Sequence, residues 1–151
     1  EILCLAGLTA GLHASQKNEY NITVLRGPSI SELILSEEPI AYAGIDRPDV
    51  ILALSQEGVD RRRPLFAGLR SKTRVLQVPE VTLPPTRAEI SGIDLRSLGV
   101  KPQDWALAAL AALAKTDRII SMDMLRTALT TRFRDEVLAS ALQLVEKVYK
   151  N

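Results

Sequence analysis

Short apolar runs, separated by glycine, proline and polar residues, fill the first two thirds of the chain. This pattern predicts strands over residues 2–6, 30–35, 50–54 and 74–78, a weaker one over 87–93, and an extended stretch from about residue 13. The run at 50–54 is apolar throughout, as parallel strands covered on both faces are. We therefore expect it at the centre of the sheet.

A helical crossover is predicted between the strands at 50–54 and 74–78. Ser55 is a suitable N-cap, and Val59 and Phe66 share one face of the segment that follows. Pro64 lies inside this segment, where a proline removes a helical hydrogen bond, so we expect two short helices or a kink. The unit of strand, crossover and strand is the building block of a parallel sheet with right-handed connections.

The last third of the chain changes to a helical pattern. Residues 79–85 hold three prolines and predict an extended connector. Pro102 suits a first helical turn, Ser121 is a candidate N-cap, and apolar residues recur at helical spacing from 137 to 148. We expect an α/β fold, a mostly parallel sheet with helices on both faces and an α-helical C-terminal segment. It would form a single domain over 1–151, with 1–100 as the sheet part and 101–151 packed on it.

The short connection after residues 2–6 conflicts with this arrangement. Parallel strands need a crossover of a dozen or more residues, and the next extended stretch begins by about residue 13. If residues 2–6 form a parallel strand, the chain between Gly7 and Leu12 is too short to return across the sheet. On that premise, residues are missing near Leu8 and Thr9.

The charge balance and the cysteine content limit the classes of binding partner and the cellular compartment that we expect. Nineteen basic and 18 acidic residues leave a net charge of +1, so no strong field favours nucleic acid or a membrane surface. The one cysteine, Cys4, cannot form an internal disulfide and lies in an apolar run. No apolar stretch approaches the roughly 20 residues that span a bilayer, and no export signal opens the chain. We expect a cytoplasmic protein.

The candidate chemistry is sparse. Arg26 and Gly27 lie in a turn before a strand, where a guanidinium and backbone N–H groups could meet a phosphate or carboxylate, although an ordinary turn is the favoured interpretation. Residues 61–63 are three consecutive arginines, a run that is usually a solvated face. His13 is the only histidine, and no carboxylates or thiols cluster near it in the sequence. No nucleophile with its base and no metal-ligand set is predicted.

The order of these pieces resembles the gamma subunit, or gamma domain, of the 2-oxoacid:ferredoxin (acceptor) oxidoreductases. Residues 47–57, Arg-Pro-Asp-Val-Ile-Leu-Ala-Leu-Ser-Gln-Glu, are similar to that family's Pro-Asp-Val strand and crossover helix. Tyr20, the turn at 26–29 and Ser-Glu-Glu-Pro-Ile at 36–40 are similar to a Tyr, an Arg-Gly-Gly loop and a later phrase of the family. Pro28 replaces the second loop glycine. Residues 2–8 resemble its opening strand, without the Gly-Gly-Gln-Gly turn that follows there.

The resemblance implies a role in the thiamine-dependent oxidative decarboxylation of a 2-oxoacid to an acyl-CoA, with electrons passed to ferredoxin. Thiamine diphosphate and iron–sulfur clusters would be held by the alpha, beta and ferredoxin-like sibling subunits, with contact to CoA possible for this chain and a homodimer possible in isolation. The implied cofactor-binding residues are Gly7, Arg26, Gly27 and Ser29. A stand-alone nucleotide- or phosphate-binding α/β module is the alternative.

Overall fold

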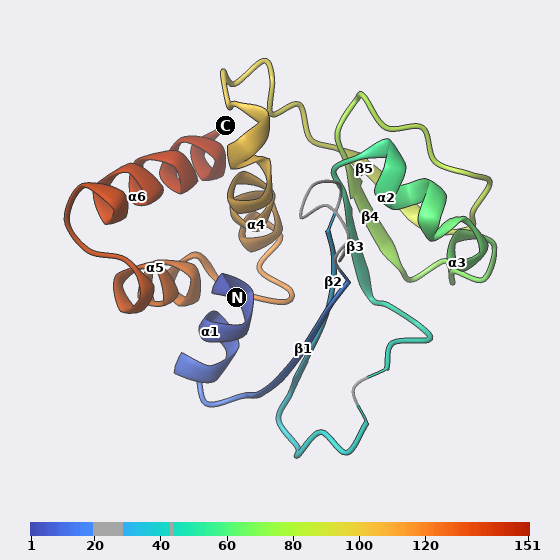
Figure 1. The fold of residues 1–151 in the computed structure, drawn as a ribbon, viewed down its shortest axis with the longest axis horizontal. Coiled ribbons are helices and arrows are strands. Elements are labelled where there is room, and N and C mark those ends of the chain that lie inside the picture. The colour runs from blue at the N-terminus through green and yellow to red at the C-terminus, as the bar shows by residue number, and fades with distance from the viewer. Residues whose placement is uncertain (20–28, 43) are drawn as a thin grey trace. The chain divides into compact units, whose positions relative to one another are not determined.

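A computed structural model of the protein describes residues 1–19, 29–42 and 44–151 (Figure 1). The chain divides into two compact units, which are described separately: residues 1–16, 33–43 and 95–151, and residues 17–32 and 44–94. The strands are β1 (His13–Glu19), β2 (Ile30–Ser36), β3 (Val50–Ala53), β4 (Arg74–Gln77) and β5 (Glu89–Gly92). The helices are α1 (Ile2–Thr9), α2 (Gln56–Arg61), α3 (Arg63–Ala67), α4 (Trp105–Lys115), α5 (Met122–Arg132) and α6 (Asp135–Lys150), with a 3-10 turn η1 (Pro102–Asp104) before α4.

The predicted parallel sheet is confirmed in the second unit. Its strand order is β3-β4-β5, all parallel, with Val50 opposite Arg74 and Arg74 opposite Glu89. The prediction that residues 50–54 lie at the sheet centre is wrong, because β4 is the middle strand. Val75 and Leu76 of β4 are buried, whereas most of β3 is half-buried. The apolar core of β4 is only two residues long between polar ends, so the sequence pattern understates its burial.

The crossover breaks at the predicted place. Ser55 caps α2 by accepting a hydrogen bond from the Gly58 N–H at 3.2 Å, and α2 ends at Arg61. Arg62 is the junction residue, and Pro64 lies in the first turn of α3, where its missing N–H costs no helical bond. Val59 and Phe66 are buried, which confirms them as the apolar face of the crossover.

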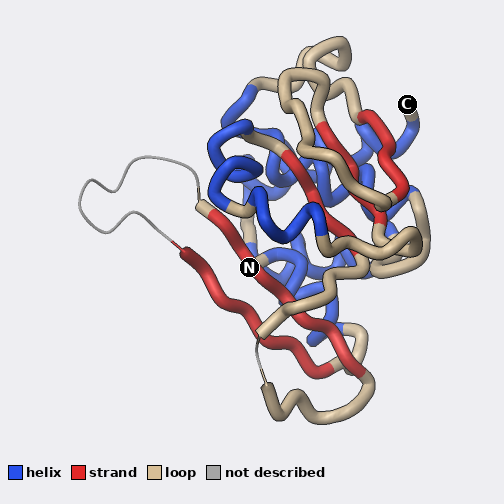
Figure 2. The backbone as a smooth tube through the Cα atoms, turned by 90° about the vertical axis from the view of Figure 1, so that its right-hand side faces the viewer, coloured by secondary structure: helices blue, strands red, loops and turns tan. Residues whose placement is uncertain are grey.

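Strands β1 and β2 form a separate two-stranded antiparallel sheet, visible side by side in Figure 2. The boundary between the two compact units falls within both strands. The Ser31 hydroxyl donates to Asn18 Oδ1 at 2.6 Å, close to the end where residues 20–28 connect the strands. The sheet prediction was therefore correct for the parallel part and missed this antiparallel pair.

The predicted strand over residues 2–6 is wrong, because these residues belong to helix α1. The Leu5 N–H donates to the Glu1 carbonyl at 2.9 Å, as in an α-helix, and the Thr9 hydroxyl donates to the Leu5 carbonyl at 2.9 Å. Ala6 is fully buried, and α1 packs against α5. A short run that is apolar at every position carries no periodicity, so it fits a buried helix as well as a strand.

The argument for missing residues near Leu8 and Thr9 loses its premise with this correction. Both residues lie in the last turn of α1, and the Gly11 N–H donates to the Leu8 carbonyl at 3.1 Å. Gly11 has a φ of +85°, a left-handed conformation that suits glycine where the chain turns from α1 into β1. No crossover is required between a helix and the strand that follows it.

The C-terminal helices are confirmed, and α4, α5 and α6 pack on one another in the first unit. Leu125, Leu129 and Val145 are fully buried between them. Ser121 caps α5 as predicted, since its hydroxyl accepts from the Met124 N–H at 3.2 Å. Apolar burial at helical spacing therefore holds this part of the chain together.

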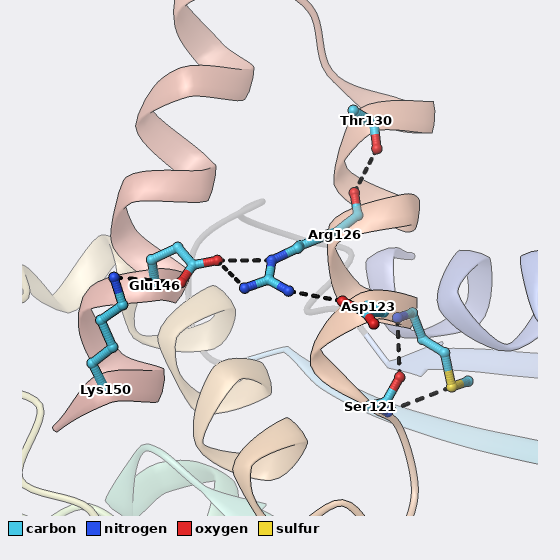
Figure 3. A network of polar contacts seen from close by, with 7 residues as sticks. Ser121, Asp123, Arg126, Thr130, Glu146 and Lys150 are labelled. Atoms are coloured by element: carbon cyan, nitrogen blue, oxygen red, sulfur yellow. Dashed lines mark hydrogen bonds and ion pairs between the residues drawn. The ribbon is translucent and has the colours of Figure 1, made fainter.

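An ion-pair network joins α5 to α6 on the surface of the same unit (Figure 3). Arg126 donates through Nε to Glu146 Oε1 at 2.7 Å and through Nη1 to Asp123 Oδ1 at 2.8 Å. The hydrogen bond that Arg126 donates to Glu146, followed by the one that it donates to Asp123, raises the pKa of Arg126 above its ordinary value. A raised pKa means that the cation is retained up to the folded-state pKa, so Arg126 adds no pH dependence to stability near neutrality.

Candidate functional site

The residues predicted to touch a cofactor fall into different parts of the structure. Gly7 is buried in α1 of the first unit, and a Cβ built on it would lie 2.4 Å from Cδ2 of Leu35. Ser29 is exposed and immediately precedes β2 in the second unit. Arg26 and Gly27 lie outside the described residues. Close packing explains the glycine at position 7 without a ligand, and the cofactor role of all these residues stays a prediction.

The structure describes the two strands that residues 20–28 connect in the sequence. Glu19 is the last residue of β1 and Glu32 lies near the start of β2, so these carboxylates stand on the two strands that residues 20–28 connect. Arg62 Nη2 donates to Glu19 Oε1 at 2.5 Å and to Glu32 Oε1 at 2.9 Å. One guanidinium at the junction of α2 and α3 thus bonds a carboxylate on each of the two strands. We call Glu19, Glu32 and Arg62 the loop-base cluster.

Local structure explains why Arg62 can reach both strands. The junction takes it out of regular helical geometry, with φ −109° and ψ 17°. Its neighbours Arg61 and Arg63 instead pair within their own segment, with Glu57 at 3.1 Å and Asp60 at 3.5 Å. The three arginines that the sequence presents as one charged run therefore have different partners.

The loop-base cluster is partly screened from water. The side chain of Arg62 is 32% exposed, that of Glu19 41% and that of Glu32 22%. Two carboxylates face one cation, so the cluster carries one net negative charge. The guanidinium donates a charge-assisted hydrogen bond to each carboxylate. The arrangement holds β1, β2 and the junction of α2 and α3 together.

Sequence reasoning missed the loop-base cluster. Arg62 was interpreted as part of a solvated charged face, and its partners are 43 and 30 residues away in the sequence. A useful signal was present in the proline at position 64, because a broken helix turns consecutive side chains in different directions. The carboxylate partners themselves carry no local pattern.

Two further observations bear on what the chain can do. Within residues 1–19, 29–42 and 44–151, no three His, Cys, Asp or Glu side chains lie close enough together to hold a metal ion. Among the helices of these same ranges, none has the length and apolar character needed to cross a membrane.

The chain belongs to the pyruvate ferredoxin/flavodoxin oxidoreductase family, whose pattern matches it over residues 1–151. The resemblance seen in the sequence is thereby confirmed. No curated protein sequence matches the chain.

Solved structures share its fold. The gamma subunit of a keto/oxoacid ferredoxin oxidoreductase from Geobacter sulfurreducens PCA superposes with a TM-score of 0.73 at 20% identity, over 99% of this chain and 86% of that one. Pyruvate oxidoreductase subunit PORC from Thermotoga maritima superposes with a TM-score of 0.71 at 16% identity, over 99% of this chain and 85% of that one. A 2-oxoglutarate:ferredoxin oxidoreductase from Magnetococcus marinus, with 2-oxoglutarate, coenzyme A and succinyl-CoA bound, superposes with a TM-score of 0.73 at 18% identity. The match covers 99% of this chain but only 28% of that longer chain.

Proposed function

We propose that the chain is the gamma subunit, or gamma domain, of a 2-oxoacid:ferredoxin oxidoreductase. The observation that carries the proposal is the family match over all 151 residues, to which the shared fold of the Geobacter gamma subunit adds support. The reaction cleaves the bond between the carboxylate and the carbonyl carbon of the 2-oxoacid and releases carbon dioxide. The acyl group passes to the CoA sulfur, whose thiol proton is released, and ferredoxin accepts the two electrons of the cleaved bond one at a time.

In this proposal the chain supports the reaction without holding the reacting groups. Sibling subunits of alpha, beta and ferredoxin-like type supply thiamine diphosphate and iron–sulfur clusters. The chain contributes the loop at residues 26–29, with Arg26, Gly27 and Ser29 facing CoA, cofactor or a neighbouring subunit. The loop-base cluster supports the two strands that residues 20–28 connect, because Arg62 bonds both Glu19 and Glu32.

Reconstitution tests this assignment. The purified chain is expected to show no turnover of pyruvate, 2-oxoglutarate or other 2-oxoacids, and to restore CoA-dependent reduction of ferredoxin when mixed with its sibling subunits. Turnover by the chain alone would overturn the proposal. Calorimetry of the lone chain with CoA and adenine nucleotides distinguishes the alternative, since tight binding without any restored activity favours an independent nucleotide-binding module.

A charge-matched pair of variants tests the loop. In the reconstituted complex, Arg26→Gln is expected to lower kcat/KM for CoA or the 2-oxoacid by about tenfold or more, since charge-assisted hydrogen bonds to an anion are strong ones. Arg47→Gln removes one positive charge from an exposed position outside residues 26–29 and should leave the rate unchanged. Equal rates for the two variants would remove the loop from the proposal.

A further inference from the structure

A basic hollow opens on the second unit beside the amino ends of β4 and β5. It has a volume of about 680 Å³ and is lined by the segment that runs from the end of α3 to Lys72, together with Arg87. Arg70, Lys72 and Arg87 bring three cations to this one hollow, and Ser71 adds a hydroxyl. Among the residues that the structure describes, no acidic side chain lines it.

The cations of the basic hollow are poorly neutralised. Arg70 Nη2 lies 3.7 Å from Asp49 Oδ1, and this carboxylate is 83% exposed, so the pair is weak. Lys72 and Arg87 form no ion pair with any residue that the structure describes. The nearby carboxylate of Glu89 is already held by Arg74, through bonds of 3.2 Å to each of its oxygens.

Like charges in a concave surface favour a bound anion. Each cation repels the other two, and a multivalent anion replaces this repulsion with attraction. Arginine offers a planar fork of donors that matches phosphate oxygens, and lysine adds a compact positive charge. Arg70, Lys72 and Arg87 are all exposed, so their charged groups are accessible to an anion in solution.

We propose that the basic hollow binds a small molecule that carries two or more phosphate groups. One phosphate monoester carries a charge of about −1.5 to −2 near neutrality, which leaves part of three positive charges unbalanced. A diphosphate balances them. The hollow lies at the amino ends of the strands, whereas ligands of open parallel sheets usually bind beyond the carboxyl ends. The inference therefore stands independently of the proposed oxidoreductase function.

Calorimetric titration of the full chain with inorganic pyrophosphate tests the proposal. The wild type is expected to bind with an affinity that falls as salt rises. The double variant Lys72→Gln, Arg87→Gln should bind about tenfold more weakly for each cation removed. The control is Arg61→Gln with Arg63→Gln, which removes the same two charges from the neighbouring helices and should bind like the wild type.

Several results would overturn the proposal. The first is that the wild type shows no heat of binding with pyrophosphate. The second is that both double variants bind pyrophosphate equally weakly. The third is that orthophosphate binds as tightly as pyrophosphate. Binding of a glutamate-rich peptide in place of pyrophosphate would assign the hollow to an acidic protein segment instead. Should the double glutamine variant unfold, as judged by circular dichroism, Lys72→Arg with Arg87→Lys keeps both charges and must retain binding within about threefold of the wild type.

Discussion

Replacing Arg62 by alanine is the sharpest test of the loop-base cluster. The substitution removes two charge-assisted hydrogen bonds, to Glu19 and Glu32, and leaves these carboxylates on neighbouring strands with no cation between them. A fully buried pair would cost several kcal/mol, but the three side chains are between 22% and 41% exposed, and water screens them. Taking about 1 kcal/mol for each contact after this discount, we expect the free energy of unfolding to fall by about 2 kcal/mol.

The neighbouring residue provides the control for this measurement. Arg61→Ala removes the same side chain from an exposed pair with Glu57, four residues away on α2, and should cost about 0.5 kcal/mol or less. Urea unfolding of wild type and both variants, followed by far-UV circular dichroism, gives the two differences. High salt should shrink the effect of Arg62→Ala only in part, because the pair is half-buried.

A double-mutant cycle isolates the contribution of the cluster itself. In a chain that already carries Glu19→Gln and Glu32→Gln, adding Arg62→Ala should lower the free energy of unfolding only slightly, because the partners of the guanidinium have lost their charge. If Arg62→Ala destabilises no more than Arg61→Ala, or costs the same with and without its carboxylates, the reasoning about the cluster is wrong.

Three predictions concern the packing of the first unit. Gly7→Val should destabilise by about 1 to 3 kcal/mol in thermal or urea unfolding, because even a Cβ would lie 2.4 Å from Cδ2 of Leu35; unchanged stability would contradict the close approach. Leu125→Ala, at a position with no exposed area in α5, should cost about 2 to 5 kcal/mol in the same assay, and a loss below 1 kcal/mol would refute its place in the core. Trp105→Phe leaves the Val100 carbonyl without the 3.1 Å bond from the indole Nε1, so a loss of about 1 to 3 kcal/mol is expected, and a stabilised variant would exclude this bond.

The C-terminal helices could be predicted from the sequence because several local signals agree there. Ser121 caps α5, apolar residues recur at helical spacing through α6, and the core positions follow from that spacing. The short strands β3 and β4 were likewise visible as apolar runs between turns, whereas β5 gave only a weaker signal. Signals of this kind depend on residues close in the sequence, which is why they survive without knowledge of the fold.

Helix α1 and the strand order could not be predicted for a related reason. An apolar run such as residues 2–9 has no period, and only its packing against α5 settles the helical form. The apolar character of β3 suggested a central strand, yet centrality is a property of the neighbours that pair on each side, and β4 has both. Tertiary pairing therefore overrode the local composition in both places.

Three consecutive residues of the candidate site also differ in how far the sequence predicts their contacts. Arg61, Arg62 and Arg63 look alike in the sequence, but the helix ends after Arg61 and a new one begins with Pro64 in its first turn. In an unbroken helix, three consecutive residues point in different directions. Each of the three arginines would then favour a carboxylate three or four residues away on the same helix. Arg61 and Arg63 do so, whereas Arg62, at the break, is released from that spacing and meets Glu19 and Glu32. The helix break at Pro64 thus determines which of the three arginines bonds the two strands, so backbone geometry gives identical neighbouring side chains different partners.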